Sequence, residues 1–321
     1  MTDRFLSLIV SCYLPSETSV QVAQELSKIL GSYPEELELV YLWNGITDEH
    51  AKIRHEITSC LGYHQNCKII DRYENVGVGE GYKILCDEAV GRYIYCLTDD
   101  DLISLGNITE IIFLLRSNEN IAVAHQLLDD ENYRESIIFT EVFNTKSPEH
   151  HITLAYVGYR MGALPGTIFS KDIYDREERL WSKKLYPWIE IAFSSDVREY
   201  AIFNPENKIK VNPGAPVHLR FNDRVTRGFD YGYNERLKYI EHCHPTVKEV
   251  YQYLLIRWIG NIFRKLKNHD RELAYKMLDH IDLPIKNRFL AGLIFSLKIE
   301  FLSSRETLQG GIKWLIYSRL A

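Results

Sequence analysis

Apolar residues follow two different spacings over the first hundred positions, and the two spacings alternate. Apolar runs of strand length are "FLSLIVSCY", "ELELVYLWNG", "CKIIDRY" and "GRYIYCLT". Segments with helical spacing separate them, such as residues 16–34, where Val22, Leu26 and Ile29 recur three or four positions apart. This alternation predicts an α/β fold with a doubly wound, mostly parallel sheet that binds a nucleotide at the carboxyl ends of its strands.

The pattern changes after residue 101. Residues 105–120 have helical spacing, residues 121–128 and 136–143 are strand candidates, and residues 166–181 combine a strand with a short helix. These segments predict further strands and helices in the second part of the chain.

The segment 200–235 is irregular and contains prolines, glycines, aromatic residues and arginines. Such a composition favours a loop that becomes ordered around a ligand. From about residue 245 onward, every segment has helical spacing. We therefore predict an α/β domain over residues 1–240 and a helical region over residues 241–321.

The composition narrows the classes of protein to consider. With 45% apolar and 26% charged residues, the chain resembles ordinary soluble globular proteins, and its net charge of −6 argues against nucleic acid as the main partner. The six cysteines form no C-x-x-C pair, which favours free thiols in a cytoplasmic, reducing compartment. We expect no signal peptide, and the apolar run 289–297 is too short to span a bilayer.

Three adjacent aspartates, Asp99, Asp100 and Asp101, end the fourth strand pattern. Adjacent negative charges repel one another unless a cation offsets them. Carboxylates with open coordination positions suit Mg²⁺ or Mn²⁺, and these ions also bind the oxygens of a diphosphate. A solvated turn whose acids cap the following helix is the alternative interpretation of the same three residues.

The segment that precedes these aspartates favours the metal interpretation. Residues 74–101, "ENVGVGEGYKILCDEAVGRYIYCLTDDD", resemble the family 2 glycosyltransferases of the GT-A type over their whole length. The positions that match the family pattern are Asn75, Gly77, Gly81, Ala89, Gly91, Tyr93, Ile94, Leu97 and the three aspartates. The resemblance implies a GT-A, Rossmann-like domain over residues 1–240, with a nucleotide-sugar half at 1–101 and an acceptor half at 102–240.

The resemblance also implies a donor site around the first strands. Tyr13 keeps the aromatic residue that relatives place beneath the nucleobase, and Asn44 replaces an acid that normally accepts a hydrogen bond from uracil or thymine. Since an amide both donates and accepts, the preferred base stays open, and Asp71 is an alternative base reader. The expected donor-binding residues are Ser11, Tyr13, Asn44, Asp71, Asn75, Gly77, Lys83, Asp99, Arg224 and Arg227.

The metal ligands follow from the same comparison. By position, Asp100 or Asp101 is the expected ligand of Mn²⁺ or Mg²⁺, and Asp99 lies nearer the ribose or the water shell of the metal. His218 can complete the coordination, and Arg224 and Arg227 can bind the diphosphate through forked hydrogen bonds. A surface salt-bridge network is the alternative for these loop residues.

Many relatives carry a Glu-Asp pair at the start of a later helix, and this chain lacks the pair. "LYPWIEIAF" occupies that place, and Glu190 is its only acid. We expect Glu190 to be the base that takes the proton of the acceptor hydroxyl, with Asp196 as the second choice. Trp188 is the candidate for stacking on an acceptor sugar, and a core tryptophan is the alternative.

The resemblance implies an inverting glycosyltransferase. It moves a sugar from a nucleotide-diphosphate donor to a hydroxyl of a glycan or lipid-linked acceptor, in capsule or O-antigen synthesis. A sugar-nucleotide nucleotidyltransferase and a non-catalytic module that binds a sugar nucleotide or glycan are the alternatives. The carboxyl-terminal segments "LLIRWIGNIFRKLK" and "GGIKWLIYSRL" are amphipathic, so we expect them to form a helical subdomain or to lie peripherally on the inner face of a membrane.

Overall fold

A computed structural model describes residues 4–129, 140–144, 147–162, 164–177, 187–194, 199–212 and 236–265, and every structural statement below concerns these residues. The elements of the first part are β1 (Leu6–Cys12), α1 (Glu17–Ser32), β2 (Leu37–Asn44), η1 (Asp48–His50), α2 (Ala51–Leu61), β3 (Cys67–Arg72), α3 (Val78–Glu88) and β4 (Tyr93–Thr98). Those of the second part are α4 (Leu105–Ser117), β5 (Val123–Gln126), β6 (Glu141–Asn144), η2 (Pro148–His150), α5 (His151–Arg160), β7 (Thr167–Ser170), α6 (Lys171–Glu177), α7 (Pro187–Ala192), β8 (Glu199–Phe203) and α10 (Pro245–Lys265).

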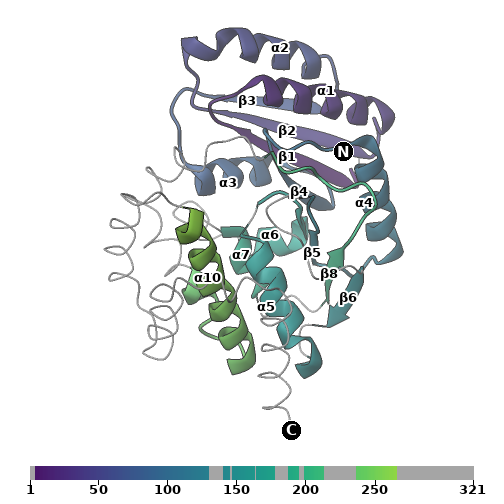
Figure 1. Cartoon of the computed structure of the whole chain (residues 1–321). Coiled ribbons are helices and arrows are strands. Elements are labelled where there is room, and N and C mark those ends of the chain that lie inside the picture. Colours follow the sequence, from purple (N-terminus) through teal and green to yellow (C-terminus); the bar gives the residue numbers. More distant parts are fainter. Residues whose placement is uncertain are drawn as a thin grey trace. The chain divides into compact units, whose positions relative to one another are not determined.

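The strands form one mixed sheet of eight strands in the order β3-β2-β1-β4-β7-β5-β8-β6. β3, β2, β1 and β4 are parallel to one another, as are β5 and β8. β7 is antiparallel to both β4 and β5, and β6 is antiparallel to β8. The predicted parallel sheet with flanking helices is confirmed, and the second part of the chain adds antiparallel strands to it (Figure 1).

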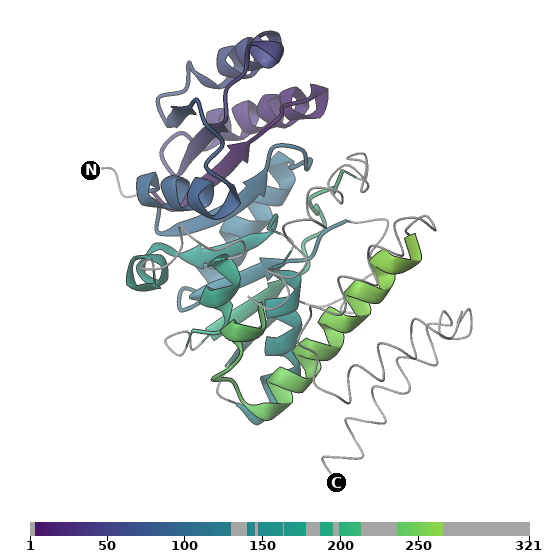
Figure 2. The same ribbon diagram turned by 90° about the vertical axis from the view of Figure 1, so that its left-hand side faces the viewer.

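The continuous apolar run of β1 reflects its place between β2 and β4. Leu8, Ile9 and Val10 are all fully buried, because helices cover both faces of the sheet here. α1 and α2, the two purple helices of Figure 1, lie side by side on one of these faces, and Figure 2 shows the same pair from another direction. α3 packs against the opposite face of β1 and β2.

Successive side chains of β2 point to opposite faces of the sheet. Trp43 belongs to the core that α1, α2 and α4 share. Leu42 and Asn44 lie next to Gly81 of α3, where an added Cβ would approach the Asn44 Nδ2 atom to 3.1 Å. A small residue at position 81 therefore lets α3 lie close to the strand ends.

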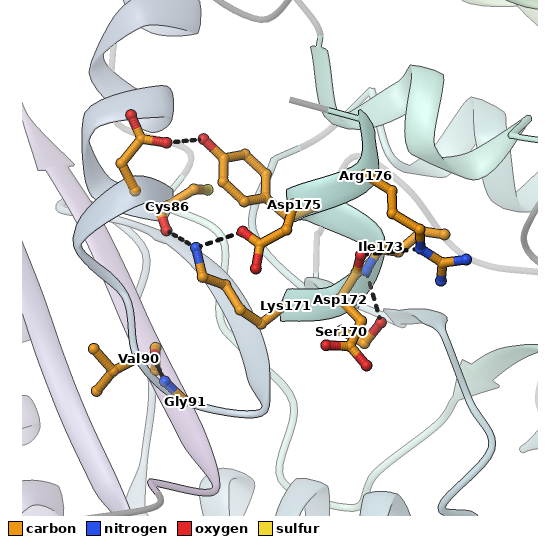
Figure 3. Close-up of polar contacts among 12 residues, drawn as sticks. Cys86, Val90, Gly91, Ser170, Lys171, Asp172, Ile173, Asp175 and Arg176 are labelled. Atoms are coloured by element: carbon orange, nitrogen blue, oxygen red, sulfur yellow. Dashed lines mark hydrogen bonds and ion pairs between the residues drawn. The ribbon is translucent and has the colours of Figure 1, made fainter. Parts of the chain in front are cut away.

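Polar contacts join α6 to the last turns of α3, as Figure 3 shows. The Lys171 Nζ atom donates to the carbonyl oxygen of Cys86 at 3.0 Å. The hydroxyl of Tyr174 donates to Oδ1 of Asp87, and the Nζ atom of Lys83 binds the other oxygen of that carboxylate at 2.6 Å. Because α6 follows β7, these contacts tie the predicted acceptor half to the predicted nucleotide-sugar half.

The chain divides into two compact units, Met1–Gln252 and Tyr253–Ala321. The division falls inside α10, and the boundary that we predict near residue 240 stays a prediction. The described residues include α10 from the predicted helical region. The first amphipathic segment, "LLIRWIGNIFRKLK", extends beyond the described residues, and the second, "GGIKWLIYSRL", lies outside them. Within the described ranges, no helix combines the length and the apolar composition that a membrane crossing requires.

Candidate active site

The strands β1, β2 and β4 end at one edge of the sheet. Ser11 of β1 pairs with Thr98 of β4 and with Leu42 of β2, so the three parallel strands finish together. Tyr13 and Asp99, which follow β1 and β4, therefore lie at the same edge. The carboxyl edge of a doubly wound sheet is where such folds bind their ligands.

Asp99 is held between β1 and α1. The hydroxyl of Ser19 donates to Oδ2 of Asp99 at 2.9 Å, and the thiol of Cys12 donates to the same oxygen at 3.1 Å. Burial, together with the negative charge of Asp99, raises the pKa of the Cys12 thiol, so the thiol keeps the proton that it donates. Burial likewise raises the pKa of Asp99 to about 6, and the two donated hydrogen bonds oppose that rise.

Asp101 holds the segment 209–212 against the end of β4. Its Oδ1 atom accepts a hydrogen bond from the backbone N–H of Asn212 at 3.0 Å, and its Oδ2 atom accepts one from the hydroxyl of Thr98. Next to it, Leu102 and Lys210 exchange backbone hydrogen bonds of 2.9 Å in both directions. Asp101 is 8% exposed, so its carboxylate serves the packing of this segment.

Asp100 lies between these two anchored neighbours and is partly exposed. No group of three or more His, Cys, Asp or Glu side chains in the described part of the chain could hold a metal ion. Mg²⁺ does not need such a cage, because it is commonly bound by one or two carboxylates together with substrate phosphates and water. The oxygen donors at this edge therefore fit a divalent cation that shares its coordination with a bound diphosphate.

Asn44, the residue that replaces the family acid, braces the turn before α3. Its Oδ1 atom accepts from the backbone N–H of Val76 at 2.9 Å, and its Nδ2 atom donates to the carbonyl oxygen of Gly77 at 3.3 Å. Asn75 accepts the N–H of Gly77 at 2.8 Å, and Gly77 has a φ of +85°, which favours glycine. The Asn44 amide is 3% exposed, so its contacts are with the protein backbone.

Tyr13 is an exposed aromatic residue that follows β1 at this edge. Its side chain is 49% exposed, and a Cβ added to Gly45 would lie 3.4 Å from its ring and 3.3 Å from Asn75. The next residue, Leu14, has a φ of +58°, a conformation that costs a branched side chain on the order of 1 kcal/mol. The turns after β1 and β2 thus meet the turn before α3 around an exposed ring.

Two other expected donor-binding residues form ion pairs with the protein. The Oδ2 atom of Asp71, on β3, lies 2.6 Å from Nη2 of Arg54, whose guanidinium lies over the ring of Trp43. Lys83 pairs with Asp87 one turn further along α3, as described above. Their roles in donor binding stay predictions.

The structure places Trp188 in the core. The indole is 2% exposed, donates from Nε1 to the carbonyl oxygen of Met161 at 2.5 Å, and packs edge-on against Tyr82 of α3. This position corresponds to the core interpretation of Trp188, and no ring face is open for a sugar in this arrangement. Glu190, two residues later on α7, is partly exposed.

Several expected site residues lie outside the described residues, namely Asp196, His218, Arg224 and Arg227. Their roles stay predictions. The described segment 199–212 ends at Asn212, whose backbone N–H donates to Asp101 and whose side-chain amide lies 3.5 Å from the hydroxyl of Thr18.

Sequence reasoning missed Ser19 and Asn212, which bind the outer two aspartates. A signal for Ser19 is present in the sequence, because it shares the apolar stripe of α1 with Val22, Ala23 and Leu26. A polar residue on a buried stripe needs a hydrogen-bond partner. No local pattern links Asn212 to Asp101, since 111 positions separate them.

Comparison with protein families identifies one match. The family model described as glycosyl transferase family 2 matches residues 7–164, which contain β1 to β4 and the three aspartates. A search of curated protein sequences finds no match to the chain.

Solved structures share the fold at low sequence identity. The mannosyltransferase PcManGT from Pyrobaculum calidifontis, in complex with GDP-Man and Mn²⁺, aligns with a TM-score of 0.56 and 11% identity over 92% of this chain and 81% of that one. TarS residues 1–349 from S. aureus, in complex with UDP-GlcNAc, align with a TM-score of 0.53 and 13% identity over 84% and 78% of the two chains. The shared feature is the GT-A sheet with its helices.

Proposed function

We propose that this chain, whose residues 7–164 match the model of glycosyl transferase family 2, is an inverting transferase that uses a nucleotide-diphosphate sugar. The observation that carries the proposal is the carboxyl edge of β1, β2 and β4. There an exposed aromatic ring, a glycine turn and a run of three aspartates follow the ends of neighbouring parallel strands. The acceptor is a hydroxyl of a glycan or of a lipid-linked saccharide.

In this proposal the donor nucleotide lies across the strand ends. Tyr13 offers its ring to the nucleobase, and the turn that Asn44 holds, with Asn75 and Gly77, borders the ribose. PcManGT was solved with GDP-Man and TarS with UDP-GlcNAc, so guanosine and uridine nucleotides are the first donors to consider. Asp71 remains the alternative base reader, and it pairs with Arg54.

Asp100 is the proposed carboxylate ligand of Mn²⁺ or Mg²⁺. Asp101 is the other candidate by position, and Asp99 and Asp101 both accept hydrogen bonds from the protein. When bound, a divalent cation offsets the charge that develops on the leaving nucleoside diphosphate. PcManGT, the mannosyltransferase of the same fold, was solved with Mn²⁺.

Glu190 is the proposed base for the acceptor hydroxyl. It lies on α7 and is the only acid of that helix. A carboxylate that takes the hydroxyl proton lets the oxygen attack the anomeric carbon while the diphosphate leaves on the opposite side, so the configuration inverts. We expect Glu190→Gln to lower kcat at least a hundredfold and to leave nucleotide affinity within twofold of the wild type.

The proposed setting is the synthesis of a surface polysaccharide, such as capsule or O-antigen, on the cytoplasmic side of a membrane. All six cysteines are free thiols in the structure, and a reducing compartment keeps them so. The lipid-linked acceptor and a peripheral contact through the carboxyl-terminal helices belong to the same proposal.

The experiment that tests the function measures release of nucleoside diphosphate from a panel of UDP-, GDP-, TDP- and CDP-sugars. We expect one donor to be hydrolysed slowly without acceptor, in a reaction that needs Mn²⁺ or Mg²⁺ and that Asp100→Ala abolishes. Tight binding of a sugar nucleotide without turnover, with or without glycan acceptors, would identify a non-catalytic binding module instead. Formation of a sugar nucleotide from a sugar phosphate and a nucleoside triphosphate would identify a nucleotidyltransferase.

A further inference from the structure

Ser19 interrupts the buried stripe of α1. It is 2% exposed, and Val22, Ala23 and Leu26, which lie on the same side of the helix, are buried as well. A serine is less favourable than alanine inside a helix, and a buried hydroxyl without a partner costs roughly 1–3 kcal/mol. A compensating interaction is therefore required at this position.

The hydroxyl of Ser19 makes two hydrogen bonds in opposite directions. It accepts the backbone N–H of Ser16, the cap of α1, at 3.0 Å, and it donates to Oδ2 of Asp99 at 2.9 Å. The first bond belongs to the capping of the helix and requires only an acceptor. The second bond crosses from α1 to the end of β4 and requires the hydroxyl proton.

The second donor to the same oxygen is weaker. Cys12 also donates to Oδ2 of Asp99, but a thiol is a poor donor in comparison with a hydroxyl. Two donors that converge on one carboxylate oxygen fix the orientation of the carboxyl group. Among the side chains that bind this oxygen, Ser19 therefore supplies the stronger constraint.

We propose that Ser19 is a positioning residue of the donor site, which fixes Asp99 and thereby the direction in which Asp100 faces the diphosphate and its cation. This inference rests on the proposed function. Asp99 and Asp100 share a rigid peptide unit, so anchoring the side chain of Asp99 to α1 also restrains the backbone that carries Asp100. In catalytic sites, a displacement of about 1 Å can cost roughly a hundredfold in rate, so the placement of Asp100 matters to the proposed reaction.

Three variants distinguish positioning of Asp99 by Ser19 from a contribution of Ser19 to the stability of the fold alone. Ser19→Ala removes the hydroxyl and introduces the best helix former, so α1 is retained. Ser19→Thr keeps a hydroxyl at the same position. Ser32→Ala is the matched control, because Ser32 lies at the other end of α1, is exposed, and bonds only within the helix, to the carbonyl oxygen of Lys28 at 2.9 Å.

The test is calorimetric titration of UDP, GDP, TDP and CDP, each with and without Mn²⁺, on these proteins. We expect Ser19→Ala to weaken binding of the preferred nucleotide about tenfold with Mn²⁺ and less than twofold without it. Ser19→Thr should restore most of the Mn²⁺-dependent affinity, and Ser32→Ala should match the wild type.

Two results would overturn the inference, and they differ from each other. If Ser19→Ala lowers the melting temperature but binds the nucleotide with Mn²⁺ as tightly as the wild type does, the residue is structural only and the proposed function stands. If the wild type binds none of the four nucleotides, the proposed function fails and the positioning role fails with it.

Discussion

Asp99 is a partly buried acid, and its ionisation makes the stability of the folded chain depend on pH. Burial raises its pKa from 3.8 to about 6 in the folded chain. Between these two values the folded state keeps a proton that the unfolded state has lost, so the contribution of Asp99 to the free energy of unfolding falls as the pH rises through this window. Above pH 6 the carboxylate of Asp99 is ionised and partly buried in the folded chain, and this lowers the free energy of unfolding.

The variant Asp99→Asn removes this ionisation and keeps an oxygen that accepts from Ser19. We expect it to be more stable than the wild type by about 1–3 kcal/mol at pH 7.5 and equal to it near pH 4. Urea unfolding of both proteins in metal-free buffer at the two pH values measures the difference. A difference that is the same at both pH values would show that the ionisation of Asp99 is not its cause.

Glycine is required at position 91 for a steric reason. A Cβ there would lie 2.5 Å from Oγ of Ser7 and 2.9 Å from the backbone carbon of Leu6. We expect Gly91→Ala to lower the free energy of unfolding by at least about 2 kcal/mol, because β1 cannot move without disturbing both of its neighbours.

Gly77→Ala is the comparison for this substitution, since its Cβ would meet no atom within 4 Å and only its φ of +85° is unfavourable. Its expected cost is about 1 kcal/mol. Urea unfolding of both variants gives the two values. The steric explanation fails if Gly77→Ala is the more damaging of the two.

At the scale of elements, the contact between α6 and α3 links the two halves of the first unit. Tyr174→Phe removes the hydroxyl that donates to Asp87 and leaves the pair between Asp87 and Lys83 intact. We expect a loss of about 1–2 kcal/mol in the free energy of unfolding, since hydrogen bonds to charged groups are the stronger ones. Tyr63→Phe, at an exposed hydroxyl, is the control and should change stability by less than about 0.5 kcal/mol. Equal effects of the two substitutions would argue against the link.

Trp188 belongs to the packing between α7 and the end of α5. Trp188→Phe removes the donor to the carbonyl of Met161, and we expect a loss of roughly 1–3 kcal/mol in the free energy of unfolding. Thermal and urea unfolding measure this loss. A stability equal to that of the wild type would contradict the importance of this hydrogen bond to the core.

The sequence was sufficient to predict those elements whose apolar spacing is strong. β1 to β4 and the helices between them are long, periodic and consecutive, so their order in the chain predicts the parallel half of the sheet. The insertion of β7 between β4 and β5 could not be predicted, because it depends on pairing between strands that lie about 70 residues apart in sequence. The backbone partners of Asp101 at Asn212 and of Asn44 at Val76 were hidden for the same reason, since each lies on a distant segment.

At the scale of the whole molecule, the central claim is that the carboxyl edge of the parallel strands binds a nucleoside diphosphate together with a divalent cation. The direct test is calorimetric titration of UDP and GDP, with and without Mn²⁺, on the wild type, Asp100→Ala and Asp172→Ala. Asp172 is an exposed acid at the start of α6, so its variant controls for the loss of one negative charge. We expect one nucleotide to bind the wild type and Asp172→Ala with Mn²⁺ and to bind Asp100→Ala at least tenfold more weakly. Binding that needs neither Mn²⁺ nor Asp100, or no binding of either nucleotide, would contradict the account.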